Sequence, residues 1–111
     1  MPLRRRVDSK ASQDAALLRA ARYYNAPWFV AKDPVSIPRR YAGGDPVDIE
    51  IAGLLAAHLA WGRRETILAK AGDWLHRMEN RPADFLRNPS PRTAAAMKGF
   101  VHRTLCDTDA L

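Results

Sequence analysis

Cysteine is almost absent from the sequence, which has only Cys106 among its 111 residues. A single cysteine cannot form a disulfide within the chain, and no cysteines and histidines are grouped at the spacing of a zinc site. We therefore expect a protein of a reducing compartment, the cytoplasm, with no structural metal. We also expect no cofactor.

The sequence also lacks a long apolar run. Its longest apolar stretch, residues 47–61, is interrupted by Asp48, Glu50 and His58, so it is too short and too polar to span a bilayer. No apolar segment follows the arginines near the N-terminus, so we expect neither a secretory signal nor a membrane partner. Hydrophobic residues make up 47% and charged residues 27% of the chain, which is typical of a folded globular protein.

Positive charge is in excess, with a formal net charge of +6. Three of these charges lie together at Arg4, Arg5 and Arg6, within residues 1–11, which we expect to form a basic, disordered leader. A basic chain is attracted to phosphate backbones. A solvated tail is the simpler interpretation of the cluster, and an arm that contacts nucleic acid is the alternative.

Helical signals dominate the rest of the chain. Ser12 is expected to cap a helix over residues 13–24. Asp45 and Pro46 form a cap-plus-proline start for a second helix that continues to Trp61. This second helix is apolar around nearly its whole circumference, so we expect it to be the most buried helix, with His58 in the core.

Three more helices are expected, one from about Arg63 to Glu79 and two shorter ones that begin at Pro82 and Pro91. Residues 25–45 contain three prolines and a Gly-Gly pair but also several apolar side chains. They predict a long ordered loop that lies across the core. No β-hairpin signal is visible. The sequence thus predicts an all-α helical bundle of about five helices with a proline-rich loop.

The last residues predict an incomplete domain. Asp107 looks like a helix cap, but the chain ends at Leu111, too soon for a cooperative helix. We therefore expect residues 12–111 to be the N-terminal helical half of a larger domain, with a missing C-terminal half as partner. An inert product of a truncated gene is another interpretation.

Five segments of the chain are distinctive when taken together. They read YNAPWF at 24–29, DPVSIPRRY at 33–41, DIEIAG at 48–53, LAWGRR at 59–64 and GFVHRT at 99–104. The combination resembles a family of uncharacterised bacterial proteins, a domain of unknown function. The resemblance covers nearly all of the chain from about Leu17, and it implies that full-length members are about twice as long.

That family is distantly similar to the helix-hairpin-helix DNA glycosylases. The similarity lies in a long buried helix, a short polar turn and an amphipathic helix, here residues 48–61, 62–65 and 66–79. In that superfamily the turn approaches the damaged base pair, while the hairpin and the catalytic Lys or Asp lie in the second half. No glycine-containing hairpin of that kind is present, so the resemblance implies no catalytic residue in this chain.

The first candidate site is the turn formed by Trp61, Gly62, Arg63 and Arg64. A helix N-terminus attracts phosphate through its free N–H groups, and Trp61 would stack on a displaced base. The alternative is a core tryptophan beside two solvated arginines.

The second candidate site is His102 with Arg103, which would make a phosphate or base contact. Alternatively, Arg103 pairs with Asp107 or Asp109 to fix the local turn.

Two functions of different classes remain. The first is a DNA-repair role as the N-terminal part of a DNA-glycosylase-like protein of unknown substrate, which by itself is non-catalytic and binds DNA weakly. The second is a non-enzymatic helical module for DNA binding or protein interaction, in which the turn after Trp61 belongs to a helix-turn-helix.

Overall fold

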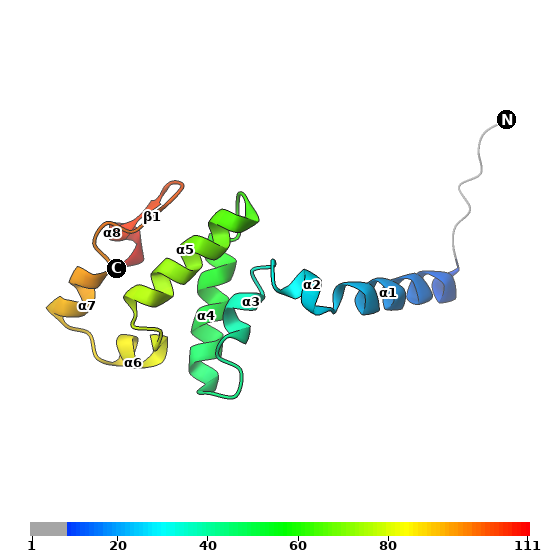
Figure 1. Ribbon diagram of the computed structural model, residues 1–111, viewed down its shortest axis with the longest axis horizontal. Helices are drawn as coiled ribbons and strands as arrows, with labels where there is room; N and C mark the ends of the chain where they lie inside the picture. Colours follow the sequence, from blue (N-terminus) through cyan, green and yellow to red (C-terminus); the bar gives the residue numbers. More distant parts are fainter. Residues whose placement is uncertain (1–8) are drawn as a thin grey trace.

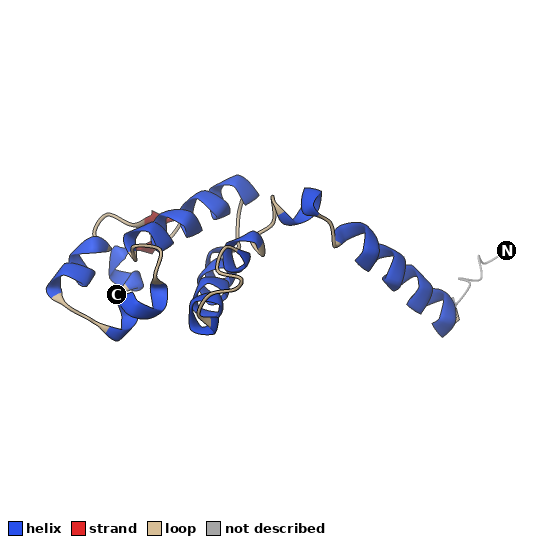
Figure 2. Cartoon of the chain, turned by 60° about the horizontal axis from the view of Figure 1, so that its bottom comes forward, coloured by secondary structure: helices blue, strands red, loops and turns tan. Residues whose placement is uncertain are grey.

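The computed structural model describes residues 9–111, which form eight helices and one two-stranded hairpin (Figure 1). The all-α class predicted from the sequence is confirmed (Figure 2). The elements are α1 (Lys10–Tyr24), α2 (Pro27–Val30), α3 (Ser36–Arg39), α4 (Pro46–Leu59), α5 (Arg64–Arg77), α6 (Pro82–Arg87), α7 (Pro91–Ala96), β1 (Val101–His102), β2 (Leu105–Cys106) and α8 (Asp107–Ala110).

Helix α1 begins earlier than the sequence predicts. Ser9 has an extended backbone, and its Oγ accepts a hydrogen bond from the N–H of Ser12 at 3.3 Å, so Ser9 is the cap. The prediction of a disordered leader is therefore wrong for residues 10 and 11, which are helical. The rest of that predicted leader, residues 1–8 with the arginine cluster, lies outside the described residues.

The proline-rich segment 25–45 is ordered, as predicted, but it is not a plain loop. It contains α2 and α3, each of four residues, which together with α8 raise the predicted five helices to eight. Proline is tolerated in a first helical turn because the N–H that it removes would have no partner there. Ile37 of α3 is completely buried and fixes the segment to the core.

Helices α4 and α5 form the centre of the fold. Helix α3 packs against both of them, and α6 packs against α4 (Figure 1). Helix α5 supplies the sharper apolar stripe, with four buried residues. The core comprises Ile37, Ala52, Ala56, Leu59, Ala71, Trp74, Leu75, Met78, Met97 and Phe100.

Helix α4 is not the most buried helix, so that prediction is wrong. Its start is as predicted, with Asp45 Oδ1 accepting the N–H of Val47 at 2.9 Å. Only three of its residues are buried, however, and Leu54 is 61% exposed. His58, predicted to lie in the core, is also exposed. The reason is that α3, α5 and α6 cover one side of this uniformly apolar helix and leave the other uncovered.

Helix α1 projects away from this core as an arm, and none of its residues is buried (Figure 1). The Cα radius of gyration is 19.3 Å, whereas a compact chain of this length has about 13 Å. At the base of the arm, the ring of Tyr23 lies 5.0 Å from Tyr24 and 5.1 Å from Trp28, between ring centroids. All three rings remain exposed.

A single carboxylate links α4 to α6. Helix α6 has no side-chain cap of its own. Instead, Asp48 Oδ1 accepts the N–H of Ala83 at 2.8 Å, across 35 positions of sequence. Ala83 is buried, so its N–H would have no other partner.

We expect Asp48→Ala to lower the free energy of unfolding by about 1–3 kcal/mol, because it leaves a buried N–H without its charged acceptor. Urea denaturation measures this loss. Glu50→Ala is the matched control, since it removes the same charge from an exposed position of the same helix. Equal losses in the two variants would contradict the role of Asp48.

Candidate nucleic-acid interface

The turn between α4 and α5 is built around Gly62. Its φ of +105° lies in the region that side chains rarely adopt. A Cβ at this position would also lie 2.9 Å from Arg103 Nη1. Glycine therefore serves both the turn and the close approach of an arginine from a distant part of the chain.

That arginine comes from a β-hairpin that the sequence analysis did not predict. Strands β1 and β2 pair antiparallel, with Val101 opposite Cys106 and His102 opposite Leu105. Arg103 follows β1 in the turn, with a φ of +53°. The usual sequence signal for such a turn is Asn-Gly or Asp-Gly, and the Arg-Thr pair here carries none.

The hairpin brings the two predicted candidate sites together at Trp61. The Cζ of Arg103 lies 4.8 Å from the ring centroid of Trp61, in a cation–π arrangement. The ring of His102 meets the same indole edge-on, with centroids 5.6 Å apart at 89°. The expected alternative for Arg103 is wrong, because no ion pair joins it to Asp107 or Asp109 among the described residues.

The two aromatic residues have different environments. Trp61 is 40% exposed, so one part of its ring is open to a ligand. His102 is 1% exposed, and neither ring nitrogen has a hydrogen-bond partner among residues 9–111. An unpaired buried polar group costs about 1–3 kcal/mol. His102 thus supports the indole from inside the fold.

Arg63 and Arg64 stand at the start of α5. Arg63 is the N-cap residue, and no side chain caps this end of the helix. The first N–H groups of α5 therefore remain available beside two exposed arginines. The guanidinium of Arg64 lies 5.4 Å from the ring centroid of Phe29, which connects this end of α5 to α2.

Two carboxylates hold the hairpin in place. Asp107 Oδ2 accepts the N–H of Gly99 at 2.9 Å, and Asp109 Oδ2 accepts the N–H of Cys106 at 2.9 Å. These backbone hydrogen bonds lower the pKa of both carboxyls. The sequence analysis predicted that Asp107 caps this last helix, and that prediction is wrong. Cys106 occupies the cap position, and Asp107 is the first residue of α8.

The arrangement defines an all-α protein with an exposed basic and aromatic surface, and the family follows from comparison. Residues 33–111 match the family described as "Protein of unknown function (DUF2400)", and the chain belongs to that family. The predicted resemblance to a domain of unknown function is thereby confirmed for residues 33–111, and the match does not extend to the segment from Leu17 to residue 32. No curated protein and no solved structure matches the chain.

Two further findings concern classes of site. Within residues 9–111, no helix has both the length and the apolar character needed to cross a membrane. The same part of the chain contains no group of three or more His, Cys, Asp or Glu residues that could hold a metal ion.

We expect Gly62→Ala to destabilise the chain by about 1–2 kcal/mol, because alanine is strained at a positive φ. It should also displace Arg103 and shift the indole N–H resonance of Trp61. Gly43→Ala is the control, since Gly43 has a φ of +85° and open space around it. An unchanged Trp61 resonance in Gly62→Ala would contradict the close contact.

Acid should loosen the hairpin before the helices. A lowered pKa in the folded state means that Asp107 and Asp109 stabilise the fold above the ordinary carboxyl pKa, about 3.9. This stabilisation is lost as the pH falls through the folded-state values. Amide hydrogen exchange at Gly99 and Cys106 should therefore accelerate on acidification, beyond the intrinsic pH dependence of exchange. Asp107→Asn should abolish this effect at Gly99 and preserve it at Cys106; equal behaviour at both amides would contradict the assignment.

Proposed function

We propose that this chain binds nucleic acid through one surface, formed by the α4–α5 turn and the tip of the β1–β2 hairpin. The observation that carries the proposal is the guanidinium of Arg103 stacked on the partly exposed indole of Trp61. We call this the turn–hairpin surface. Its members are Trp61, Gly62, Arg63, Arg64 and Arg103. The predicted base or phosphate contact by His102 is wrong, because this side chain is buried beneath the indole.

The chemistry of this surface suits a phosphate backbone with accessible bases. The uncapped start of α5 offers N–H donors and the positive end of the helix dipole, and Arg63 and Arg103 add full charges. Arginine and tryptophan also provide flat faces on which a base stacks. Such contacts position a nucleic acid without reading its sequence.

The proposal extends to the kind of protein to which this surface belongs. An apolar helix, a tight turn and an amphipathic helix, here α4, Gly62 and α5, are the features that resemble the helix-hairpin-helix DNA glycosylases. Base excision needs a positioned nucleophile or carboxylate, and none of the five members of the turn–hairpin surface is one. We therefore assign this chain the role of a non-catalytic, DNA-contacting part of a glycosylase-like protein.

One observation favours a second candidate, a protein-interaction module. The arm, α1, and the adjoining α2 expose Leu17, Tyr23, Tyr24 and Trp28. Exposed apolar and aromatic side chains that lie together are typical of contacts between proteins. These side chains are not members of the turn–hairpin surface, although the neighbouring Phe29 of α2 contacts Arg64. The two functions therefore use different residues and are compatible.

We expect Arg63→Ala combined with Arg64→Ala to weaken duplex DNA binding and to flatten its salt dependence. Each lost phosphate contact should change the slope of log affinity against log salt by about 0.9. Fluorescence anisotropy at several salt concentrations measures both quantities. Arg19→Ala with Arg22→Ala is the charge-matched control, because it removes two arginines of α1, away from the turn–hairpin surface.

Equal losses in the two double variants would mean that net charge alone drives binding, and the turn–hairpin surface would be rejected. Salt-insensitive binding would also reject this surface, because phosphate contacts made by arginines weaken as the salt concentration rises. Trp61→Leu should weaken binding to single-stranded DNA more than to duplex, because stacking needs accessible bases. An excision assay on damaged oligonucleotides tests the remaining claim: base release by the pure chain would show that this chain is itself catalytic.

A further inference from the structure

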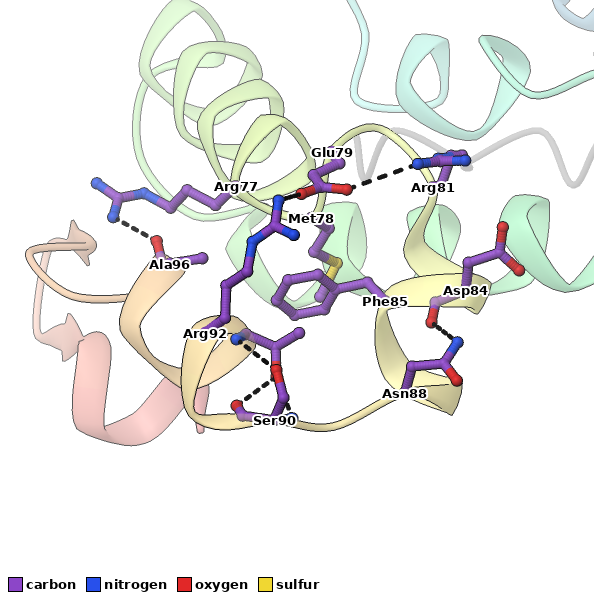
Figure 3. A pocket seen from close by; sticks show the side chains of 11 residues that line it. Arg77, Met78, Glu79, Arg81, Asp84, Phe85, Asn88, Ser90, Arg92 and Ala96 are labelled. Atoms are coloured by element: carbon purple, nitrogen blue, oxygen red, sulfur yellow. Dashed lines mark hydrogen bonds and ion pairs between the residues drawn. The ribbon is translucent and has the colours of Figure 1, made fainter.

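A pocket of about 380 Å³ lies between α5, α6 and α7, at the end of α5 that is opposite the turn–hairpin surface (Figure 3). Helix α5 has 14 residues, so this pocket is roughly 20 Å from the turn–hairpin surface. Its volume is in the range of small-molecule sites. The residues that carry the argument are Met78, Glu79, Arg81, Phe85 and Arg92.

Two carboxylates, Glu79 and Asp84, line the pocket, and Asp84 lies 3.9 Å from Arg87, which is outside the pocket. The carboxylate of Glu79 is therefore the one that faces the arginines of the rim. Glu79 Oε1 lies 2.6 Å from Arg92 Nη2, and Glu79 Oε2 lies 3.6 Å from Arg81 Nη2 (Figure 3). One carboxylate thus faces two guanidiniums from different segments. Each guanidinium has five N–H donors, so several remain free for another anion.

A third arginine at the pocket has a structural role. Arg77 Nη1 donates to the carbonyl of Ala96 at 3.0 Å and to that of Lys98 at 2.6 Å, and its Nε donates to Asp73. It ties the end of α5 to the end of α7. The charge of Arg77 is therefore paired with Asp73, and the arginines of the rim that could bind another anion are Arg81 and Arg92.

The wall of the pocket is apolar. Met78 is buried and Phe85 is half-buried, and both line the cavity beneath the charged rim (Figure 3). An aromatic ring packs well against another ring and against a methionine sulfur. The pocket therefore combines a flat apolar contact with an anion-binding rim, within the reach of one small molecule.

The backbone holds Glu79 at the rim in an uncommon conformation. Glu79 and Asn80 have φ values of +60° and +54°, and neither is glycine. The N–H of Asn80 donates to the carbonyl of Leu75 at 2.9 Å, which ends α5 in this geometry. Backbone strain of this kind is frequent at functional sites, and here it fixes the carboxylate that bridges the two arginines.

We infer that this pocket binds a small phosphate monoester that carries an aromatic ring. The phosphate dianion takes the free N–H groups of Arg81 and Arg92 and supplies the negative charge that Glu79 alone does not. The ring of the ligand packs on Phe85 and Met78. This site is independent of the proposed nucleic-acid contact.

Phenyl phosphate is the probe, titrated into the ¹⁵N-labelled full chain and followed by amide chemical shifts. We expect saturable shifts confined to residues around 79–93. Arg92→Gln should weaken binding about tenfold or more, because it removes a charge-assisted hydrogen bond. Lys98→Gln is the control, since Lys98 is an exposed cation just after α7 and does not line the pocket.

Two more variants separate ligand binding from a purely structural role. Glu79→Gln should strengthen phosphate binding severalfold, because it removes the carboxylate that competes for both guanidiniums. Phe85→Leu should weaken phenyl phosphate binding and leave inorganic phosphate binding unchanged.

The inference is overturned if phenyl phosphate gives no saturable shifts in the pocket, or if Lys98→Gln weakens binding as much as Arg92→Gln. Weaker binding by Glu79→Gln with an intact circular dichroism spectrum would also overturn it. Equal affinity for inorganic and phenyl phosphate would remove the aromatic ring from the assignment.

Discussion

The close packing of α4 against α5 is the constraint on which both candidate sites depend. Ala52 and Ala56 of α4 and Ala71 of α5 are buried in this core, and small side chains let two helix backbones approach closely. Once α5 is fixed in this way, its first turn stands beside Trp61 and the hairpin, and its last turn stands beside α6 and α7. A larger side chain at any of the three alanines would overpack this core and shift the helices that meet there.

The structure leaves two apolar surfaces uncovered, on the arm and on the outer side of α4. Leu17 and Leu18 are exposed on α1, as are Val47 and Leu54 on α4. The match to the family begins at residue 33, so α1 and α2 precede the matched segment, whereas α4 lies inside it. The two uncovered surfaces therefore differ in that only the one on α4 belongs to the matched part of the chain.

Features that depend on neighbouring residues could be predicted from the sequence. Features that depend on contacts between distant residues could not. The start of α4 follows from the adjacent Asp45 and Pro46, and the Trp61–Arg64 turn follows from its own residues. The partnership of Trp61 with Arg103 could not be predicted, because the hairpin turn lacks glycine and the two residues are far apart in sequence. The cap that Asp48 provides to α6 could not be predicted either, because Asp48 and Ala83 are 35 positions apart. His58 was misplaced because the sequence shows that α4 is apolar but not which of its sides is covered.

The isolation of α1 has a consequence for cooperativity. A 15-residue helix that buries none of its residues gains little from the rest of the fold, and helices of this length are marginal in water by themselves. The arm and the α4–α5 core then form separate cooperative units with different free energies of opening. We therefore do not expect a single two-state unfolding event: helical circular dichroism includes the arm and should report a broader transition than the indole N–H resonance of the buried Trp74. One melting temperature therefore does not describe the molecule.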